Sequence, residues 1–176
     1  MRQIDRAEAM ALLAREAEDL PARFHGCAMC GLAAGHPADV EILAERPSAV
    51  AVLDRLSTRR GHVLVILRRH AESIGEMPWV EYAEVQRLAW EAARALERVL
   101  QPRRVFVAAL GSAERLPMSF PHHHVHVLPL FDGGPADRPS EVLTWRHGVG
   151  LYAPGEAREL GATLRRAWGE AGEAGR

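Results

Sequence analysis

The sequence predicts an α+β fold in which a five-stranded antiparallel sheet carries one long helix, with further helices at both ends of the chain. Three observations lead to this prediction. Five short runs are rich in Val, Ile and Leu, as β-strands are. Most of these runs follow one another closely, without the helical crossovers that parallel strands require. The longest amphipathic stretch, residues 78–100, falls between the third and fourth runs and has the period of a helix.

The two ends of the chain are predicted to be helical. Residues 5–20 and 155–168 both repeat apolar side chains at helical spacing, and Pro21 ends the first stretch. Each therefore predicts an amphipathic helix that packs one face on the rest of the protein. The expected organisation is an N-terminal helical extension, a central domain and a C-terminal tail packed on that domain, covering residues 1–23, 24–131 and 132–176.

The central elements are separated by turn and loop signals. The five predicted strands cover residues 40–44, 49–54, 62–67, 104–110 and 122–130. Pro78 stands at the start of the long helix, a position that proline favours, and the helix is expected to end before Pro102. Residues 24–37 show little periodicity and predict a loop.

The composition is that of an ordinary globular protein, with 48% hydrophobic and 26% charged residues and a net charge of -1. This charge provides no general positive field for nucleic acid. No apolar run approaches the length that spans a bilayer. The first residues carry acidic side chains throughout, unlike a secretory signal or a transit peptide. The expectation is a cytoplasmic protein without nucleic-acid or membrane partners.

The segment 120–130 carries the pattern most informative about function. Alternate side chains of a strand point to the same face, so His122, His124 and His126 line one face and His123 the other. Three imidazoles on one face are costly to bury unless their nitrogens find partners. An imidazole near neutral pH can act as a nucleophile, a general acid or base, or a metal ligand. A surface run of histidines is the competing interpretation, and the apolar residues that alternate with this run argue against it.

This segment resembles the signature of the histidine triad family, in which three His alternate with other residues and two apolar residues follow. A second similarity lies at residues 61–70, where Gly-His precedes a β-rich run and a basic pair with a final His. In that strand Leu67 replaces the family's usual Pro, and Arg replaces Lys. The resemblance covers roughly residues 24–131 and implies a HIT-like fold.

In that family the second His of the triad attacks the α-phosphorus of a nucleotide conjugate, and water then hydrolyses the nucleotidyl-histidine. The resemblance thus implies that His124 is the nucleophile and that His126 and His62 bind phosphate oxygens and assist the leaving group. It also implies that Ser119 contacts the phosphate and Asp54 the ribose, although Asp54 could equally be a turn or cap residue. The implied substrates are dinucleoside polyphosphates or nucleoside phosphoramidates.

One departure from the family pattern keeps a second hypothesis open. Many members carry an Asn and a Gly-Gln pair before the triad, whereas this chain has Ala108 to Ser112 and then Met118 in that region. The alternative to an enzyme is therefore a non-catalytic nucleotide-binding or scaffold protein of the same family.

A homodimer is also expected. Family members commonly pair through the long helix and a strand. Here the helix 78–100 carries Trp79, Tyr82 and Trp90, more aromatic surface than one buried face needs. Large exposed apolar patches are unusual on a monomer.

Cys27 and Cys30 have a spacing that suits zinc, because two thiolates separated by two residues can share one tetrahedral ion. Taken alone, the pair could also be redox-active or simply buried. Zinc-binding bacterial triad proteins and the related galactose-1-phosphate uridylyltransferases combine such a pair with a distant His and the first His of the triad. Here that similarity implies a structural zinc bound by Cys27, Cys30, His70 and His122. His25 and His36 are alternatives to His70.

Overall fold

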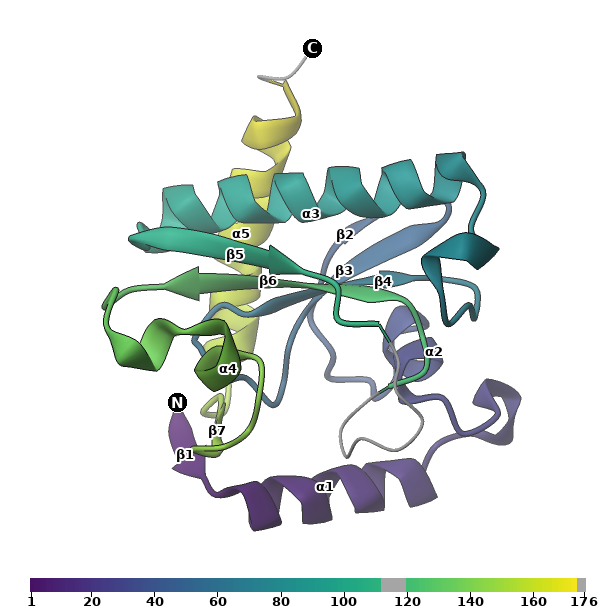
Figure 1. Cartoon of the computed structure of the whole chain (residues 1–176), viewed down its shortest axis with the longest axis horizontal. Helices are drawn as coiled ribbons and strands as arrows, with labels where there is room; N and C mark the ends of the chain where they lie inside the picture. Colours follow the sequence, from purple (N-terminus) through teal and green to yellow (C-terminus); the bar gives the residue numbers. More distant parts are fainter. Residues whose placement is uncertain (112–119, 174–176) are drawn as a thin grey trace.

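The computed structural model describes the backbone of residues 1–111 and 120–173, with side chains through residue 168. Its centre is a five-stranded sheet in the order β2-β3-β4-β6-β5, in which every neighbouring pair is antiparallel (Figure 1). The strands are β2 (Ile42–Glu45), β3 (Ala49–Leu53), β4 (Val63–Leu67), β5 (Arg104–Ala108) and β6 (His124–Leu130). The predicted α+β class and the antiparallel sheet are confirmed.

The three predicted helices are present as α1 (Arg6–Glu18), α3 (Trp79–Leu100) and α5 (Glu156–Glu173). Asp5 caps α1, because its side chain accepts a hydrogen bond from the backbone N–H of Glu8 at 2.8 Å. Helix α3 begins directly after Pro78 and ends at Gln101, whose φ of 47° lies in the left-handed region. No helix of the described residues is long and apolar enough to cross a membrane.

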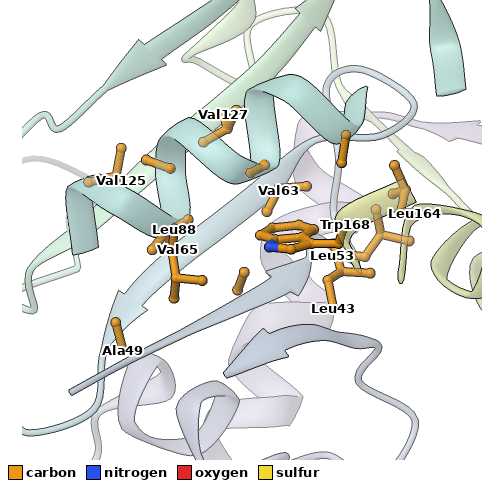
Figure 2. Close-up of a cluster of buried hydrophobic side chains, with 14 of the residues drawn as sticks. Leu43, Ala49, Leu53, Val63, Val65, Leu88, Val125, Val127, Leu164 and Trp168 are labelled. Carbon is orange, nitrogen blue, oxygen red and sulfur yellow. The ribbon is translucent and has the colours of Figure 1, made fainter. Parts of the chain in front are cut away.

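One face of the sheet packs on α3 and α5 and forms the main hydrophobic core. Val63 of β4 and Val125 of β6 point into this core, where they meet Leu88 of α3 and Leu164 and Trp168 of α5 (Figure 2). The alternate strand residues point to the opposite face. There a smaller cluster packs on α2 (Ala28–Ala33). The alternation of the strands therefore gives the sheet two apolar faces with different partners.

A buried carboxylate fastens α5 to this core. Glu91 of α3 is fully buried and accepts hydrogen bonds from Arg46 at 2.9 Å, from Arg87 at 3.1 Å and from the Trp168 indole at 3.0 Å. Burial acts to raise the pKa of Glu91, but these hydrogen bonds outweigh it and hold the pKa below its usual value. The C-terminal helix, the long helix and the turn after β2 thus share one polar anchor.

Two local predictions were wrong or incomplete. Residues 24–37, predicted to be a loop, contain the helix α2. Cys27 caps this helix, because its sulfur accepts a hydrogen bond from the Cys30 N–H at 3.4 Å. A second, two-stranded sheet pairs β1 (Arg2–Ile4) with β7 (Val149–Leu151) and was not predicted. The remaining elements are α4 (Pro139–Val142) and 3-10 turns at Ala22–Phe24, Ile74–Glu76 and Pro135–Asp137.

Helix α1 lies on the side of the sheet opposite α3 (Figure 1). Ala9 of α1 packs in a small apolar cluster with Ile4, Leu56 and Val149, so α1 rests on the β1–β7 sheet and on the segment after β3. Arg55 in that segment also pairs with Glu16 of α1 at 2.7 Å. As a result α1 lies opposite the second face of the central sheet.

Candidate functional site

The antiparallel pairing of β4 with β6 brings the histidines of two distant segments together on the side of the sheet that faces α1. His124 and His126 lie on β6, and the antiparallel register places Leu64 of β4 opposite His126. His62 immediately precedes β4, so its ring stacks on that of His126 with centroids 5.2 Å apart. The rings of His124 and His126 are 4.9 Å apart. The imidazoles of His62, His124 and His126 thus line one surface. The strand alternation predicts this for His124 and His126, but His122, predicted on the same face, precedes β6 and lies with Cys27, Cys30 and His70 instead.

His123 points to the other side of the sheet, toward α3. Its ring lies 6.5 Å from that of Tyr82, and its side chain is buried. His123 therefore lies on the opposite side of the sheet from the rings of His124 and His126.

One hydrogen bond determines which nitrogen of His124 carries the hydrogen. Its Nδ1 lies 2.7 Å from the carbonyl oxygen of His122. A carbonyl oxygen only accepts, so Nδ1 carries the hydrogen and Nε2 keeps its lone pair. Burial lowers the pKa of His124, which keeps the ring neutral at neutral pH. A neutral imidazole with an exposed lone pair is the form in which histidine acts as a nucleophile.

A second chain of polar contacts runs away from His126. Its Nδ1 is 3.0 Å from the Nε2 of His62, and the Nδ1 of His62 is 2.8 Å from Oδ2 of Asp54. Burial, followed by the nearby rings of His62 and His124, lowers the pKa of His126 to about 2. His126 therefore holds one proton, not two, at neutral pH.

The histidines open into a cavity of about 930 Å³. Its floor is the sheet, with Val52, Leu64 and the three rings. Its other walls come from α1, α2 and residues 140–146, including Leu13, Leu143 and Trp145. The sequence does not predict these walls, because apolar residues in terminal segments carry no signal that distinguishes cavity lining from ordinary packing.

The structure describes only one of the two further residues predicted to contact the substrate, Asp54 and Ser119. Asp54 lines the cavity, but its carboxylate already contacts His62 and also accepts from the backbone N–H of Leu56 at 3.2 Å. Ser119 lies outside the described residues. Phe120, the first described residue after that gap, presents its ring edge-on to His124, with centroids 6.5 Å apart.

A separate cluster gathers two thiols and two imidazoles beside the start of β6. The ligand atoms of Cys27, Cys30, His70 and His122 all lie within 4.8 Å of one another. The Nδ1 of His122 is 3.4 Å from each sulfur, and that of His70 is 3.6 Å from Cys30. Ligands of a tetrahedral zinc, with Zn–S near 2.3 Å and Zn–N near 2.0 Å, lie about 3.5 Å apart. The four side chains therefore fit one such ion, and His25 and His36 are not part of this described cluster.

The orientation of His122 suits a ligand. Its Nε2 lies 2.6 Å from the carbonyl oxygen of Leu67, to which it must donate, so Nδ1 keeps a lone pair on the side of the sulfurs. Burial lowers the pKa of His122 to about 4. Burial, with the neighbouring Cys27, raises the pKa of Cys30 to about 11. A bound cation would favour the thiolate, which is the form that binds zinc.

Comparison with known proteins identifies the family to which this arrangement belongs. The HIT domain model matches residues 37–133, more than half of the chain and the whole of the central sheet. The chain belongs to the histidine triad (HIT) family. An uncharacterised HIT-like protein of Mycoplasma pneumoniae is 30% identical over 110 residues, which cover 62% of this HIT chain and 75% of that protein.

Solved structures share the HIT fold. A zinc-bound histidine triad family protein from Mycobacterium smegmatis superposes with a TM-score of 0.63 at 23% identity, covering 84% of this chain and 96% of that one. Diadenosine triphosphate hydrolase from Plasmodium falciparum, solved with cyclomarin A, gives a TM-score of 0.58 at 11% identity, covering 74% of this chain and 77% of that one. At these identities the similarity shows the fold, which is the HIT-like fold that the sequence predicts.

Proposed function

We propose that this HIT protein is a nucleotide hydrolase or transferase that attacks the α-phosphate of nucleotide conjugates and forms a nucleotidyl-His124 intermediate. The observation that carries the proposal is the hydrogen bond from His124 to the His122 carbonyl. It places the hydrogen on Nδ1 and leaves the lone pair on Nε2, in a ring that lines a large cavity.

The remaining residues have supporting roles in this proposal. A bond forms between His124 Nε2 and phosphorus, and the bond from phosphorus to the leaving group breaks. His126 and His62 supply the hydrogen-bond donors for phosphate oxygens and the proton that the leaving group needs. Ser119 is a further phosphate contact in this proposal, and Asp54, which lines the cavity, accepts from the ribose hydroxyls. Water then cleaves the bond between phosphorus and His124, so that one difficult displacement becomes two easier ones.

The size of the cavity favours a conjugate over a simple mononucleotide. At about 930 Å³ it lies near the upper end of the range, roughly 300–1,000 Å³, of small-molecule pockets. Its far walls, α1 and residues 140–146, both lie outside the residues that match the HIT domain. We therefore propose substrates with a second bulky group, such as dinucleoside polyphosphates, together with nucleoside phosphoramidates.

A panel of nucleotide conjugates tests the proposal. We expect release of a nucleoside monophosphate from at least one dinucleoside polyphosphate or phosphoramidate. The same compounds should raise the melting temperature, since a ligand at 100 times its Kd adds about 2.7 kcal/mol of stability. A raised melting temperature without any product would contradict the proposed enzymatic activity. It would favour the alternative, a non-catalytic nucleotide-binding or scaffold protein.

We further propose that a structural zinc ion occupies the cluster of Cys27, Cys30, His70 and His122. Four protein ligands would close the tetrahedron and leave no position for water, as in structural sites. When bound, the ion would tie α2 to the end of β4 and to the start of the strand that bears His124. A cytoplasmic location is the setting in which such thiols stay reduced.

A homodimer is the expected assembly. Strand β5 is an edge of the central sheet, and Val107 on it is 49% exposed. On α3, Trp79 is 77% and Trp90 45% exposed. Light scattering at micromolar concentration should report twice the chain mass of 19.4 kDa. The variant V107K, which places a charge on this edge strand, should shift the mass toward one chain. A wild-type protein of 19.4 kDa would contradict the dimer.

A further inference from the structure

We propose that the part of the cavity between α1 and residues 140–146 is a subsite for an apolar leaving group, and that Leu13, Leu143 and Trp145 determine its specificity. The inference rests on the proposed function, because it concerns the group that the phosphate loses. It goes beyond that function by choosing between the two substrate classes. The subsite favours a nucleoside phosphoramidate of an apolar amine over a dinucleoside polyphosphate.

The triad histidines divide the cavity into two ends. His124, His126 and Leu128 are alternate residues of β6 and therefore lie on one face of the sheet. Before them in the chain, Phe120 packs on the cluster that α2 covers. After them, Leu128 packs with Val142 of α4. A phosphate bound at His124 therefore has α2 on one side and α4 on the other.

The nucleoside takes the α2 end in this proposal. Val52, which belongs to the cluster under α2, and Asp54, the proposed ribose contact, both line the cavity at the end of β3. His124 attacks from the sheet, and in a displacement at phosphorus the leaving group departs roughly in line with the attacking atom. The leaving group is therefore directed away from the sheet, toward α1, on the side that the nucleoside does not occupy.

The walls at this second end are apolar and held in place. Leu13 of α1 and Trp145 pack on the same small cluster, which contains Val149, and both remain partly exposed where they line the cavity. The Thr58 hydroxyl donates to the carbonyl oxygen of Val142 at 2.6 Å, which ties this segment to the turn after β3. A preformed wall with a flat indole lowers the entropic cost of binding an apolar ring.

Charge separates the two substrate classes. The described wall of the cavity contains as many arginines as carboxylates, namely Arg6, Arg55, Arg146, Glu16, Asp19 and Asp54. Arg55 pairs with Glu16 at 2.7 Å, and Arg146 lies 3.7 Å from Glu141. A polyphosphate bridge brings several negative charges, and these described residues provide no surplus of positive charge to meet them. An apolar amine on a single phosphate matches this wall better.

Two phosphoramidates of adenosine monophosphate, one of phenylethylamine and one of methylamine, test the subsite. Both leaving groups are primary alkylamines, so they differ mainly in the ring. We expect kcat/KM of the wild type to be about 10-fold or more higher for the phenylethylamine conjugate, as for other apolar pockets. The variant W145A should remove most of this preference and leave the methylamine rate nearly unchanged.

Two further variants complete this experiment. L13A changes the opposite wall and should also reduce the preference, so the test remains decisive if melting curves show that W145A is unfolded. The control F131A removes a phenylalanine that is 42% exposed and does not line the cavity, and it should change neither rate. A folded W145A or L13A that keeps the full preference, or that loses both rates equally, would overturn the subsite.

Binding to H124A separates the subsite from catalysis. Calorimetry should give a Kd for the phenylethylamine conjugate about 10-fold or more below that for the methylamine conjugate, and adding W145A should bring the two values together. Equal Kd values in H124A would overturn the subsite. If the wild type turns over no conjugate but H124A shows the preference, the proposed function fails and the subsite stands.

Diadenosine tetraphosphate tests the choice of leaving group, because it offers a second ring behind a charged bridge. H124A should bind it more weakly than the phenylethylamine conjugate, and the wild type should turn it over more slowly. Tighter binding and faster turnover of the tetraphosphate, both lost in W145A, would assign these walls to a second nucleoside and overturn the preference for an apolar amine.

Discussion

Replacing His124 by alanine should abolish the transfer of label from an α-phosphate-labelled nucleotide conjugate to the protein. Turnover should fall by several orders of magnitude, roughly 10⁴-fold to 10⁶-fold by analogy with other covalent catalysts. The physical reason is that the Nε2 of His124 is the atom that bonds to phosphorus, and alanine offers no lone pair. Rapid quenching, followed by separation of labelled protein from free nucleotide, measures the intermediate directly.

The matched control is H147A. His147 is an exposed histidine whose ring pairs with Glu141 at 2.7 Å and does not line the cavity. This variant should be labelled and should turn over like the wild type. Melting curves should show that H124A remains folded, because the change removes a ring that borders an open cavity. Near wild-type turnover by folded H124A would remove His124 from its assigned role.

Removing the metal should have the largest effect on stability. Protein purified without added metal should contain close to one zinc per chain. Chelation, or the double change C27S and C30S, should lower the melting temperature by about 10 °C or more, since a loss of a few kcal/mol shifts a domain of this size by that amount. The reason is that α2 is a helix of six residues, too short to be stable alone, and the ligands would tie it to β4 and β6. Activity should fall only as a consequence of unfolding.

The variant H25N serves as the control for the zinc prediction. His25 lies two residues before Cys27 but is not part of the cluster, so H25N should keep both the zinc and the melting temperature. A metal-free wild type that is fully stable would refute the site. X-ray absorption that shows a water among the zinc ligands, in place of two sulfurs and two nitrogens, would contradict the structural role.

The fold was predictable wherever the pattern was local and periodic. The 3.6-residue period of residues 78–100 specifies the helix α3 and its buried face, and the alternation in the predicted strand 122–130 specifies β6, which begins at His124. The same alternation placed His124 and His126 on one surface and His123 on the other. The resemblance named Cys27, Cys30, His70 and His122 as one group, and the fold brings these four side chains together although up to 95 positions separate them.

The sequence by itself therefore determined the class of fold, the long helix, the order of the five central strands along the chain and the shared face of His124 and His126. Only the tertiary structure decided the β1–β7 pairing, the position of α1 in the wall of the cavity and the contact between Asp54 and His62. The physical reason is the range of the interactions. The periodicity of helices and strands and the capping of helices depend on residues that are close in the sequence, so the sequence alone reveals them. By contrast, the position of Leu13 over the sheet, and of Asp54 against an imidazole, depends on how separate segments pack once the core has formed.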